Sequence, residues 1–305
     1  MTFYIKTSFF ALLGLLFLAS CNLTQEVDLE LPEYEEQIVV ESYLEPGQPF
    51  LLTLVKSSGF FDDIELDYVR EATVTITHEG NTDTLQPLEI DILTPGIEAV
   101  LDTALLSLFE PIIGQGLYLY GSFSLVPEFY NTDFSLQVTT KDGQKLSAVT
   151  QIPSPIESQE MEYRFNDDTM ALVLTTFQDD PNTVDYYRRL LVERKRVITT
   201  DSITMESDTT FVNDVDQDFT IDDEVSNGGP IVFGTGFDYE EGDTLISTLF
   251  HVTNDYYRFI ATRDAAIQAS FSPFGQPAVV YTNITGGIGL FTGFTRRRAM
   301  IVVGE

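Results

Sequence analysis

The sequence predicts a mainly β protein made of two antiparallel β-sandwich domains, with one short helix in the second domain. Short runs of β-branched and aromatic residues recur along the chain, turn residues separate these runs, and helices and strands do not alternate. This pattern favours immunoglobulin-like sandwiches over an α/β fold. Pro153 and Pro155 directly follow one of the runs. They indicate a boundary between a first domain at 38–152 and a second at 156–305.

The first domain shows clear strand chemistry. In the run Ala72–Thr77, apolar residues alternate with threonines, which places one face of the strand in a core. Asp142-Gly143 predicts a hairpin turn between two of the strands. Residues 99–109 are apolar at helical spacing and are expected to form a short helix. The strands expected in this domain are 38–44, 50–55, 72–77, 117–125, 134–140 and 145–152.

The second domain is expected to contain one helix, at 255–268, with Asn254 or Asp255 as its N-cap. Gly286-Gly287-Ile288-Gly289 is followed by strand-like residues and not by a helix. It therefore predicts a tight turn where backbone approaches backbone closely, and not a phosphate-binding loop. The strands expected in this domain are 170–177, 186–199, 244–252, 279–281, 289–294 and 299–303.

The N-terminus has the features of a bacterial lipoprotein signal. Lys6 is followed by the apolar run Phe9–Leu18, which is too short to span a bilayer as a helix. The tetrapeptide Leu18-Ala19-Ser20-Cys21 resembles a lipobox, in which the cysteine is acylated and the chain is cut before it. We therefore expect residues 1–20 to be a signal peptide and Cys21 to carry the lipid anchor.

Composition limits the function further. The chain has 48 acidic residues against 16 Lys and Arg, a formal net charge of -32. Such a charge repels nucleic acid, so no nucleic-acid partner is expected. Acidic residues are especially dense at 21–37, which we interpret as an extended tether between lipid and fold. Cys21 is the single cysteine, so the domains depend on core burial without a disulfide.

A set of short motifs recurs in a characteristic order and spacing. The motifs are Ile38-Val39-Val40-Glu41, Lys141-Asp142-Gly143, Asp185-Tyr186-Tyr187-Arg188, Asp255-Tyr256-Tyr257, Ser272-Pro273-Phe274-Gly275 and Thr282-Asn283-Ile284-Thr285-Gly286-Gly287-Ile288-Gly289-Leu290-Phe291. Together they resemble a family of uncharacterised Bacteroidota outer-membrane lipoproteins, described as a domain of unknown function and commonly encoded beside TonB-dependent receptors. The resemblance covers nearly the whole mature chain.

This resemblance implies a cellular location and a partner, but it implies no catalytic activity. We expect an outer-membrane lipoprotein that acts as an accessory or ligand-capturing partner of a TonB-dependent receptor in nutrient uptake. The resemblance is compatible with a position on either face of the outer membrane, periplasmic or cell-surface. The alternatives are a cell-surface structural or adhesion lipoprotein and a secreted hydrolase that uses paired carboxylates.

Catalytic residues are hard to assign. His78 and His251 lie in no nucleophile or metal motif and are expected at the surface or partly packed, while Cys21 is committed to the anchor. Paired carboxylates are inevitable in so acidic a chain. We therefore expect a protein that is not an enzyme and needs no cofactor, with calcium as the one candidate ion.

Two groups of residues are candidate binding sites. Asp214, Asp216 and Asp218 present carboxylates at alternate positions, as calcium loops do, although the glycine and the terminal glutamate of the helix-loop-helix motif are missing. The simpler interpretation is a solvated acidic loop. The basic residues concentrate in two runs, which hold Arg188, Arg189, Arg194, Lys195, Arg196, Arg296, Arg297 and Arg298. Neighbouring strands would make these a positive patch for carboxylates or phosphates, and pairing with nearby acids is the alternative.

Replacing the anchor cysteine tests the signal assignment. Cys21→Ala removes the thiol that would be acylated, so the variant is expected to incorporate no labelled fatty acid and to keep its signal peptide. Metabolic labelling with a palmitate analogue measures this. Efficient labelling of the variant would contradict the assignment.

Overall fold

The computed structural model describes residues 34–59, 66–90, 117–166, 169–200, 207–224, 226, 228–270 and 278–305. The expected signal peptide, Cys21, most of the acidic tether and the expected helix at 99–109 lie outside these residues. Residues 36–305 form one compact unit, and the description below concerns that unit.

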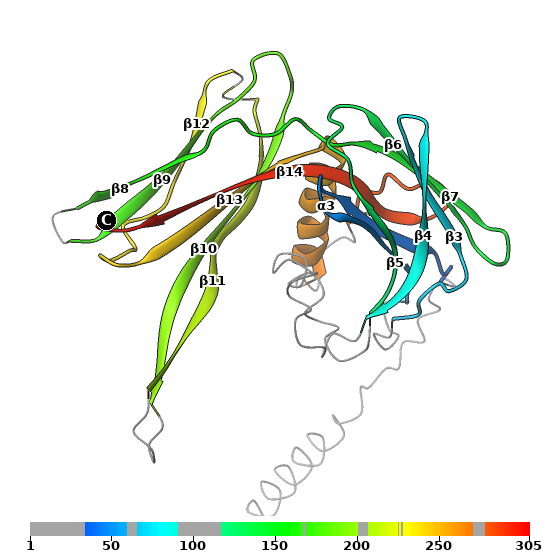
Figure 1. Ribbon diagram of the computed structural model, residues 1–305, viewed down its shortest axis with the longest axis horizontal. Coiled ribbons are helices and arrows are strands. Elements are labelled where there is room, and N and C mark those ends of the chain that lie inside the picture. Colours follow the sequence, from blue (N-terminus) through cyan, green and yellow to red (C-terminus); the bar gives the residue numbers. More distant parts are fainter. Residues whose placement is uncertain are drawn as a thin grey trace, which may run out of the picture. The chain divides into compact units, whose positions relative to one another are not determined.

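The mainly β prediction is confirmed. The described residues form one eleven-stranded sheet, one three-stranded sheet and the helix α3 (Asn254–Ser270) (Figure 1). The order in the large sheet is β11 (Ser207–Asp222), β10 (Tyr186–Thr200), β13 (Thr244–Val252), β14 (Ile288–Val302), β1 (Ile38–Leu44), β2 (Pro49–Lys56), β5 (Leu117–Leu125), β4 (Asn81–Ile90), β3 (Thr73–His78), β6 (Asp133–Thr139) and β7 (Lys145–Gln151). The small sheet has the order β12 (Pro230–Gly234), β9 (Ala171–Gln178) and β8 (Glu160–Phe165).

The long strand β14 joins the first and second parts of the chain in one sheet. Its first residues pair in parallel with β1, from Val39↔Ile288 to Leu44↔Gly293. Its remaining residues pair antiparallel with β13, ending at Thr244↔Val302. The prediction of two separate strands here is wrong, and so is the expectation of purely antiparallel pairing. Strand hydrogen bonds therefore run from one side of the predicted boundary to the other. The division into two domains stays a prediction.

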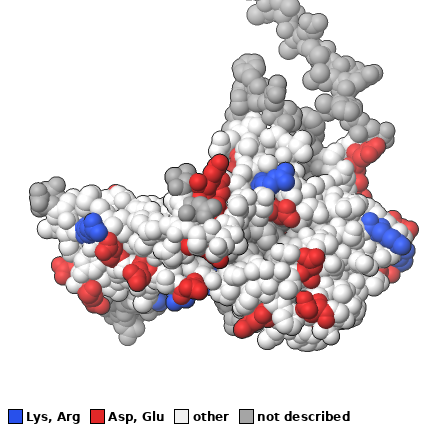
Figure 2. Space-filling view, turned by 90° about the horizontal axis from the view of Figure 1, so that it is seen from above, with Lys and Arg blue, Asp and Glu red and all other residues white. Residues whose placement is uncertain are grey.

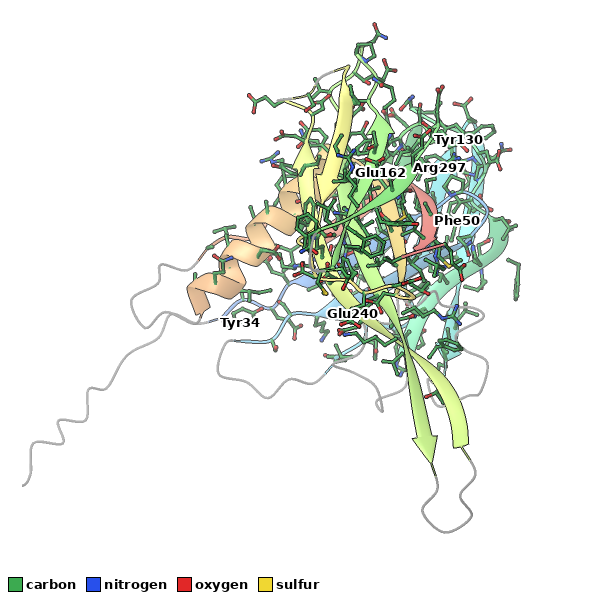
Figure 3. The ribbon with its side chains drawn as sticks, turned by 90° about the vertical axis from the view of Figure 1, so that its left-hand side faces the viewer. Tyr34, Phe50, Tyr130, Glu162, Glu240 and Arg297 are labelled. Atoms are coloured by element: carbon green, nitrogen blue, oxygen red, sulfur yellow. The ribbon has the colours of Figure 1, made fainter. Side chains whose placement is uncertain are left out.

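The first core lies inside the part of the large sheet formed by β1 to β7. Alternate residues of these strands point inward, and Phe50 (Figure 3), Phe134 and Val74 are fully buried there. The sheet curls so far that β7 returns toward β14, where Ser147 and Thr285 exchange two backbone hydrogen bonds of 3.0 and 2.8 Å. Ile284 and Phe291, from the C-terminal part of the chain, complete this core.

The second part of the chain is layered on both faces of β10, β13 and β14. On one face the small sheet packs through residues such as Val173 and Phe177 against Leu191 and Leu249. On the other face α3 packs against residues such as Phe250 and Leu290. A sandwich with one added helix results, as the sequence predicts. In the part of the chain that the structure describes, no helix is long and apolar enough to cross a membrane.

The N-cap of α3 differs from the expected one. The hydroxyl of Thr253 accepts a hydrogen bond from the Tyr256 backbone N–H at 3.2 Å, so Thr253 is the cap in place of Asn254 or Asp255. The same hydroxyl lies 2.7 Å from that of Thr292 on β14. The cap is therefore also the point where the helix is attached to the sheet.

Several strand predictions are wrong in an informative way. Asp214, Asp216 and Asp218 lie in the long strand β11 and not in a loop. Aspartate has a low strand propensity, but pairing with β10 over the full length of β11 overrides it. Strands β4, β8 and β12 were not predicted, and residues 279–281 form no strand.

The predicted close turn at 286–289 is confirmed. Gly289 has φ +113°, and a Cβ there would collide with the backbone oxygen of Val40 on β1. A Cβ on Gly286 would collide with the Lys145 carbonyl oxygen, and one on Gly287 would lie 2.5 Å from the Ile38 carbonyl oxygen. Backbone atoms cannot move aside as side chains can, so the start of β14 reaches β1 and β7 only with glycine at these positions.

Substitution of Gly289 tests this constraint. Gly289→Ala is expected to lower the free energy of unfolding by on the order of 3–5 kcal/mol, since it adds backbone strain and overlap in a packed region. The control is Gly47→Ala, where φ is +80° but nothing lies within 4 Å of the added carbon. We expect about 1–2 kcal/mol there. Urea unfolding measures both, and equal losses would refute the close-approach argument.

Candidate functional site

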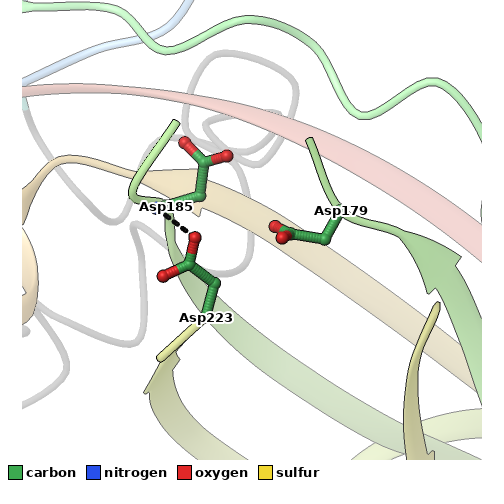
Figure 4. Close-up of side chains that lie close together, drawn as sticks. All are labelled: Asp179, Asp185 and Asp223. Carbon is green, nitrogen blue, oxygen red and sulfur yellow. Dashed lines mark hydrogen bonds between the residues drawn. The ribbon is translucent and has the colours of Figure 1, made fainter. Parts of the chain in front are cut away.

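Three buried carboxylates meet where three strands of the second part begin or end. Asp179 directly follows β9, Asp185 directly precedes β10 and Asp223 directly follows β11. Their exposed fractions are 2%, 7% and 1%. One oxygen from each lies within 4.8 Å of the others. Figure 4 shows the three side chains close together. The cluster places three acidic groups in a low-dielectric region, where isolated charges are costly.

Hydrogen-bond donors surround the cluster. Asp179 accepts from the Tyr187 hydroxyl at 2.7 Å and from the Gly228 backbone N–H at 2.8 Å. Asp223 accepts from the backbone N–H of Asp185 at 2.9 Å. The Thr183 hydroxyl donates to Asp185 at 2.6 Å. These donors partly replace the hydrogen bonds to water that the carboxylates lose on burial.

His251 on β13 supplies the remaining contact. Its Nδ1 lies 2.8 Å from the carbonyl oxygen of Ser154, which can only accept, so Nδ1 carries a proton. Its Nε2 lies 3.0 Å from the carboxylate of Asp185. Burial by itself raises the pKa of Asp185, but the hydrogen bonds from His251 and Thr183 and the charge of His251 hold that pKa below its ordinary value. His251 therefore connects the cluster to the backbone at Ser154.

The cluster has the ligand type for a hard divalent cation, and Asp179, Asp185 and Asp223 are the residues that could hold one. Both oxygens of Asp179 accept hydrogen bonds from the protein, and the two oxygens of Asp185 lie within hydrogen-bond distance of Thr183 and His251. The arrangement visible in the structure is therefore a polar clamp. It joins the ends of three strands and, through His251, the segment at Ser154 between the two parts of the chain.

The sequence did not point to this cluster. The three aspartates lie in separate turns, and only strand pairing brings them together. The one available signal was the motif Asp185-Tyr186-Tyr187-Arg188, which supplies one carboxylate and the Tyr187 hydroxyl. Burial, hydrogen bonding to Asp179 and the nearby carboxylates raise the pKa of Tyr187, so its hydroxyl stays a donor.

The predicted calcium residues are not brought together. Lys195 Nζ donates to Asp214 at 2.8 Å, and the Tyr239 hydroxyl donates to Asp216 at 2.7 Å. Asp218 lies on the opposite face, because a β-bulge between Leu191 and Val192 shifts the register of β10 and β11. Asp218 accepts two hydrogen bonds from Arg188 there, at 2.7 and 2.5 Å. Each carboxylate has a protein partner of its own.

Arg188 is the most strongly held of the predicted basic residues. Besides its two bonds to Asp218, it donates to the Tyr256 hydroxyl of α3 at 2.6 Å. Burial alone lowers the pKa of Arg188, but the bonds and charges of Asp218 and Tyr256 raise it above its ordinary value. Arg188 therefore ties β10 to β11 and to the helix.

Arg189 points to the other face and is 1% exposed. It donates to Gln217 at 2.6 Å and to Thr175 of the small sheet at 3.2 Å, and its guanidinium lies 5.4 Å from the centre of the Phe233 ring. Burial lowers the pKa of Arg189 to about 10. Its Nε has no hydrogen-bond partner. Arg189 therefore carries a buried charge whose hydrogen bonds go to neutral groups.

The remaining basic residues are distributed over several partners. On β10, the guanidinium of Arg194 lies 4.4 Å from the centre of the Phe211 ring, Lys195 also contacts Glu193, and the backbone of Arg196 pairs opposite Phe211. On β14, Arg296 pairs with Glu45 at 2.6 Å, and Arg297 donates to the Ile156 carbonyl oxygen at 3.2 Å. Arg298 is exposed.

Strand register explains why these residues do not gather on one face. Arg188 and Arg296 flank Phe250 in one row across the sheet, and Arg189 and Arg297 flank Leu249 in the next row. Neighbouring rows point to opposite faces of the sheet. On the surface shown in Figure 2, basic side chains lie among acidic ones and not in a patch of their own.

His78 differs from the expectation of a surface or partly packed residue. It is 7% exposed, and its ring lies 5.9 Å from Phe50 and 5.2 Å from Phe134. Its Nε2 lies 2.9 Å from the carboxylate of Asp83. His78 is thus part of the first core, while His251 is partly packed, as expected.

The motif residues near the C-terminus form a second polar network. Asp255 accepts from the Tyr281 hydroxyl at 2.5 Å and from the Asn283 amide at 3.1 Å. The Asn283 amide also donates to the Phe291 carbonyl at 2.7 Å and accepts from the Phe291 N–H at 3.0 Å. The motifs therefore hold α3 against β14.

Fold and polar networks together define a mainly β protein in which buried charged groups connect strands and helix. The chain belongs to the family described as domain of unknown function DUF4249, which matches residues 24–299. A comparison with curated protein sequences finds no match.

Comparison with solved structures finds distant similarities. One is a DUF4785 family protein from Legionella pneumophila, with 14% identity, 70% of this chain and 52% of that chain covered, and a TM-score of 0.24. Another is a mutant of Salmonella alpha-2-macroglobulin, with 9% identity, 92% of this chain and 15% of that chain covered, and a TM-score of 0.24. The chain thus spans about half of the first protein and a small part of the second.

Stability as a function of pH tests the Asp185–His251 pair. The pKa of folded Asp185 lies below the ordinary value of 3.8, so its contribution is present above that value and is lost as pH falls through the folded value. Asp185→Asn does not titrate there. It should be less stable than the wild type by on the order of 2 kcal/mol at neutral pH, because a buried charged hydrogen bond is lost. This difference should shrink below about pH 4.

Urea unfolding from neutral to acidic pH measures this difference. The control is Glu157→Gln, because Glu157 is exposed. It should change stability little at any pH. A constant difference between Asp185→Asn and the wild type down to pH 3 would contradict the linkage.

Proposed function

We propose that this protein is a lipid-anchored outer-membrane lipoprotein that acts as an accessory or ligand-capturing partner of a TonB-dependent receptor in nutrient uptake. The carrying observation is the N-terminal pattern, in which a charged start, a short apolar run and Leu18-Ala19-Ser20 lead to the single cysteine, Cys21. An acidic spacer up to residue 37 then separates the lipid from the first strand, Ile38–Leu44. The resemblance of the motifs to Bacteroidota lipoproteins adds the receptor as partner.

The described geometry supports a binding role over a chemical one. Asp179, Asp185 and His251 are engaged with one another or with backbone and hydroxyl groups that hold strands together. Arg188 and Arg296 are likewise paired with carboxylates. Groups used in this way stabilise a scaffold, and a scaffold on a tether is suited to presenting a surface to a membrane partner.

A cell-surface structural or adhesion lipoprotein is the second candidate. It shares the anchor and the tether, and it is favoured by the exposed apolar side chains Phe123 and Val279, which are 97% and 89% exposed. The two candidates differ in whether a receptor is bound in the membrane.

Affinity purification from outer membranes tests the proposal. A C-terminally tagged chain, extracted in a mild non-ionic detergent, is expected to bring down a TonB-dependent receptor in roughly stoichiometric amount. Tagged Cys21→Ala serves as the control, because without the lipid anchor it should be absent from the outer-membrane fraction. Recovery of the lipidated chain without any receptor would favour the adhesion role.

A further inference from the structure

The strand β11 forms an open edge of the large sheet. It pairs with β10 along its whole length, from Tyr186↔Asp222 to Thr200↔Ser207, and no described strand lies on its other side. The outward backbone N–H and C=O groups of such a strand can pair with another chain. At 16 residues, β11 is far longer than the edge strands of the small sheet, β8 and β12, which have 6 and 5.

The outer parts of β10 and β11 form an arm. Strand β13 accompanies β10 only as far as the pair Arg194↔Thr244. Beyond that pair, residues 195–200 and 207–212 continue as two strands, which run past the other strands in Figures 1 and 3. A two-stranded ribbon is marginally stable in water and is stabilised by a third strand or a packed layer. The arm therefore has physical reason to gain a partner.

Apolar side chains are exposed on the edge strand of this arm and at its base. Phe211 is 56% exposed, Val212 51% and Val215 59%. Phe211 and Val212 are neighbours in a strand, so they point to opposite faces. An added strand would extend both faces of the ribbon and cover part of these side chains.

The other end of the large sheet is protected differently. Strand β7 is bonded through Ser147 to Thr285, and it has seven residues. Its edge is thus partly used within the chain. This contrast singles out β11 as the edge with room for a long added strand.

Charge selects the kind of strand that fits. Strand β11 contains Asp208, Asp214, Asp216, Asp218 and Asp222, and it has no lysine or arginine. The basic partners of Asp214 and Asp218 come from β10, on the inner side of β11. A second copy of β11 would place aspartates against aspartates, and like charges on adjacent strands are destabilising. Lysine or arginine at alternate positions would instead match the edge.

We propose that the free edge of β11 is a docking site for an extended, lysine- or arginine-bearing segment of a partner protein, which adds to the sheet as a further strand. Main-chain hydrogen bonds to β11 supply the affinity, and the aspartates select basic segments. The inference deepens the partner role proposed above and rests on it for the existence of a partner.

A peptide of defined chemistry tests the site. The probe is a fluorescent nine-residue peptide of alternating valine and lysine that begins and ends with valine, titrated into the full mature chain at about 0.15 M salt, where weak surface attraction is screened. Saturable binding in fluorescence anisotropy is expected. The same peptide with proline at its centre keeps its charge but loses a ladder donor, so at least tenfold weaker binding is expected.

Matched variants locate the binding. Asp214→Lys reverses a charge on β11 and should weaken binding at least tenfold. Glu162→Lys reverses one on β8, a short acidic edge strand where Glu162 pairs with Arg164 much as Asp214 pairs with Lys195. It should change binding less than twofold. Circular dichroism confirms that both variants fold.

Three outcomes would overturn the proposal. The first is that the wild type shows no saturable binding of the peptide. The second is that the proline peptide binds as tightly as the original peptide. The third is that both variants weaken binding equally, which would indicate charge attraction alone. A concentration-dependent dimer abolished by Asp214→Lys would also overturn it, because the occupant would then be a second copy. Receptor co-purification is a separate measurement, so the proposed function and this docking site can fail independently.

Discussion

The position of β14 between β1 and β13 is the constraint on which both cores depend. Its first residues contribute Phe291 to the first core. Its later residues pair with β13 and extend the part of the large sheet against which the small sheet packs. Both arrangements require the chain to enter β14 in close backbone contact with β1, which glycine at 289 permits. The two parts of the chain are therefore connected by strand hydrogen bonds as well as by a linker.

Polar groups reinforce this arrangement where apolar packing ends. The segment between the two parts is held through the Ser154 carbonyl oxygen, which accepts from His251 Nδ1 and, at 3.1 Å, from the Thr295 hydroxyl. The carboxylate cluster is anchored to the same histidine through Asp185. Removing one member of such a network leaves its partners buried without compensation, so the network is costly to disturb. Several hydrogen bonds together therefore fix the position of the short segment at Ser154.

The sequence predicted the elements whose pattern is local. The strands Ile38–Leu44 and Thr244–Val252 were predicted at their observed bounds, because an alternating or continuous apolar run shows where they begin and end. Strand β11 was missed, since its aspartates argue against a strand until Arg188, Lys195 and Tyr239 are known to pair with them. The same limit applies to the cluster of Asp179, Asp185 and Asp223. Sequence distance hides their proximity, which depends on which strands become neighbours.

The order of the elements along the chain has a consequence for the time at which the fold forms. Strand β1 is among the first residues of the fold to appear and pairs with residues 288–293, close to the end. During synthesis from the N-terminus, the first core therefore lacks β14 until the residues up to Phe291 have been made. Contacts of such long sequence separation form slowly. The first core therefore stays incomplete until residues more than 240 positions after β1 can pair with it.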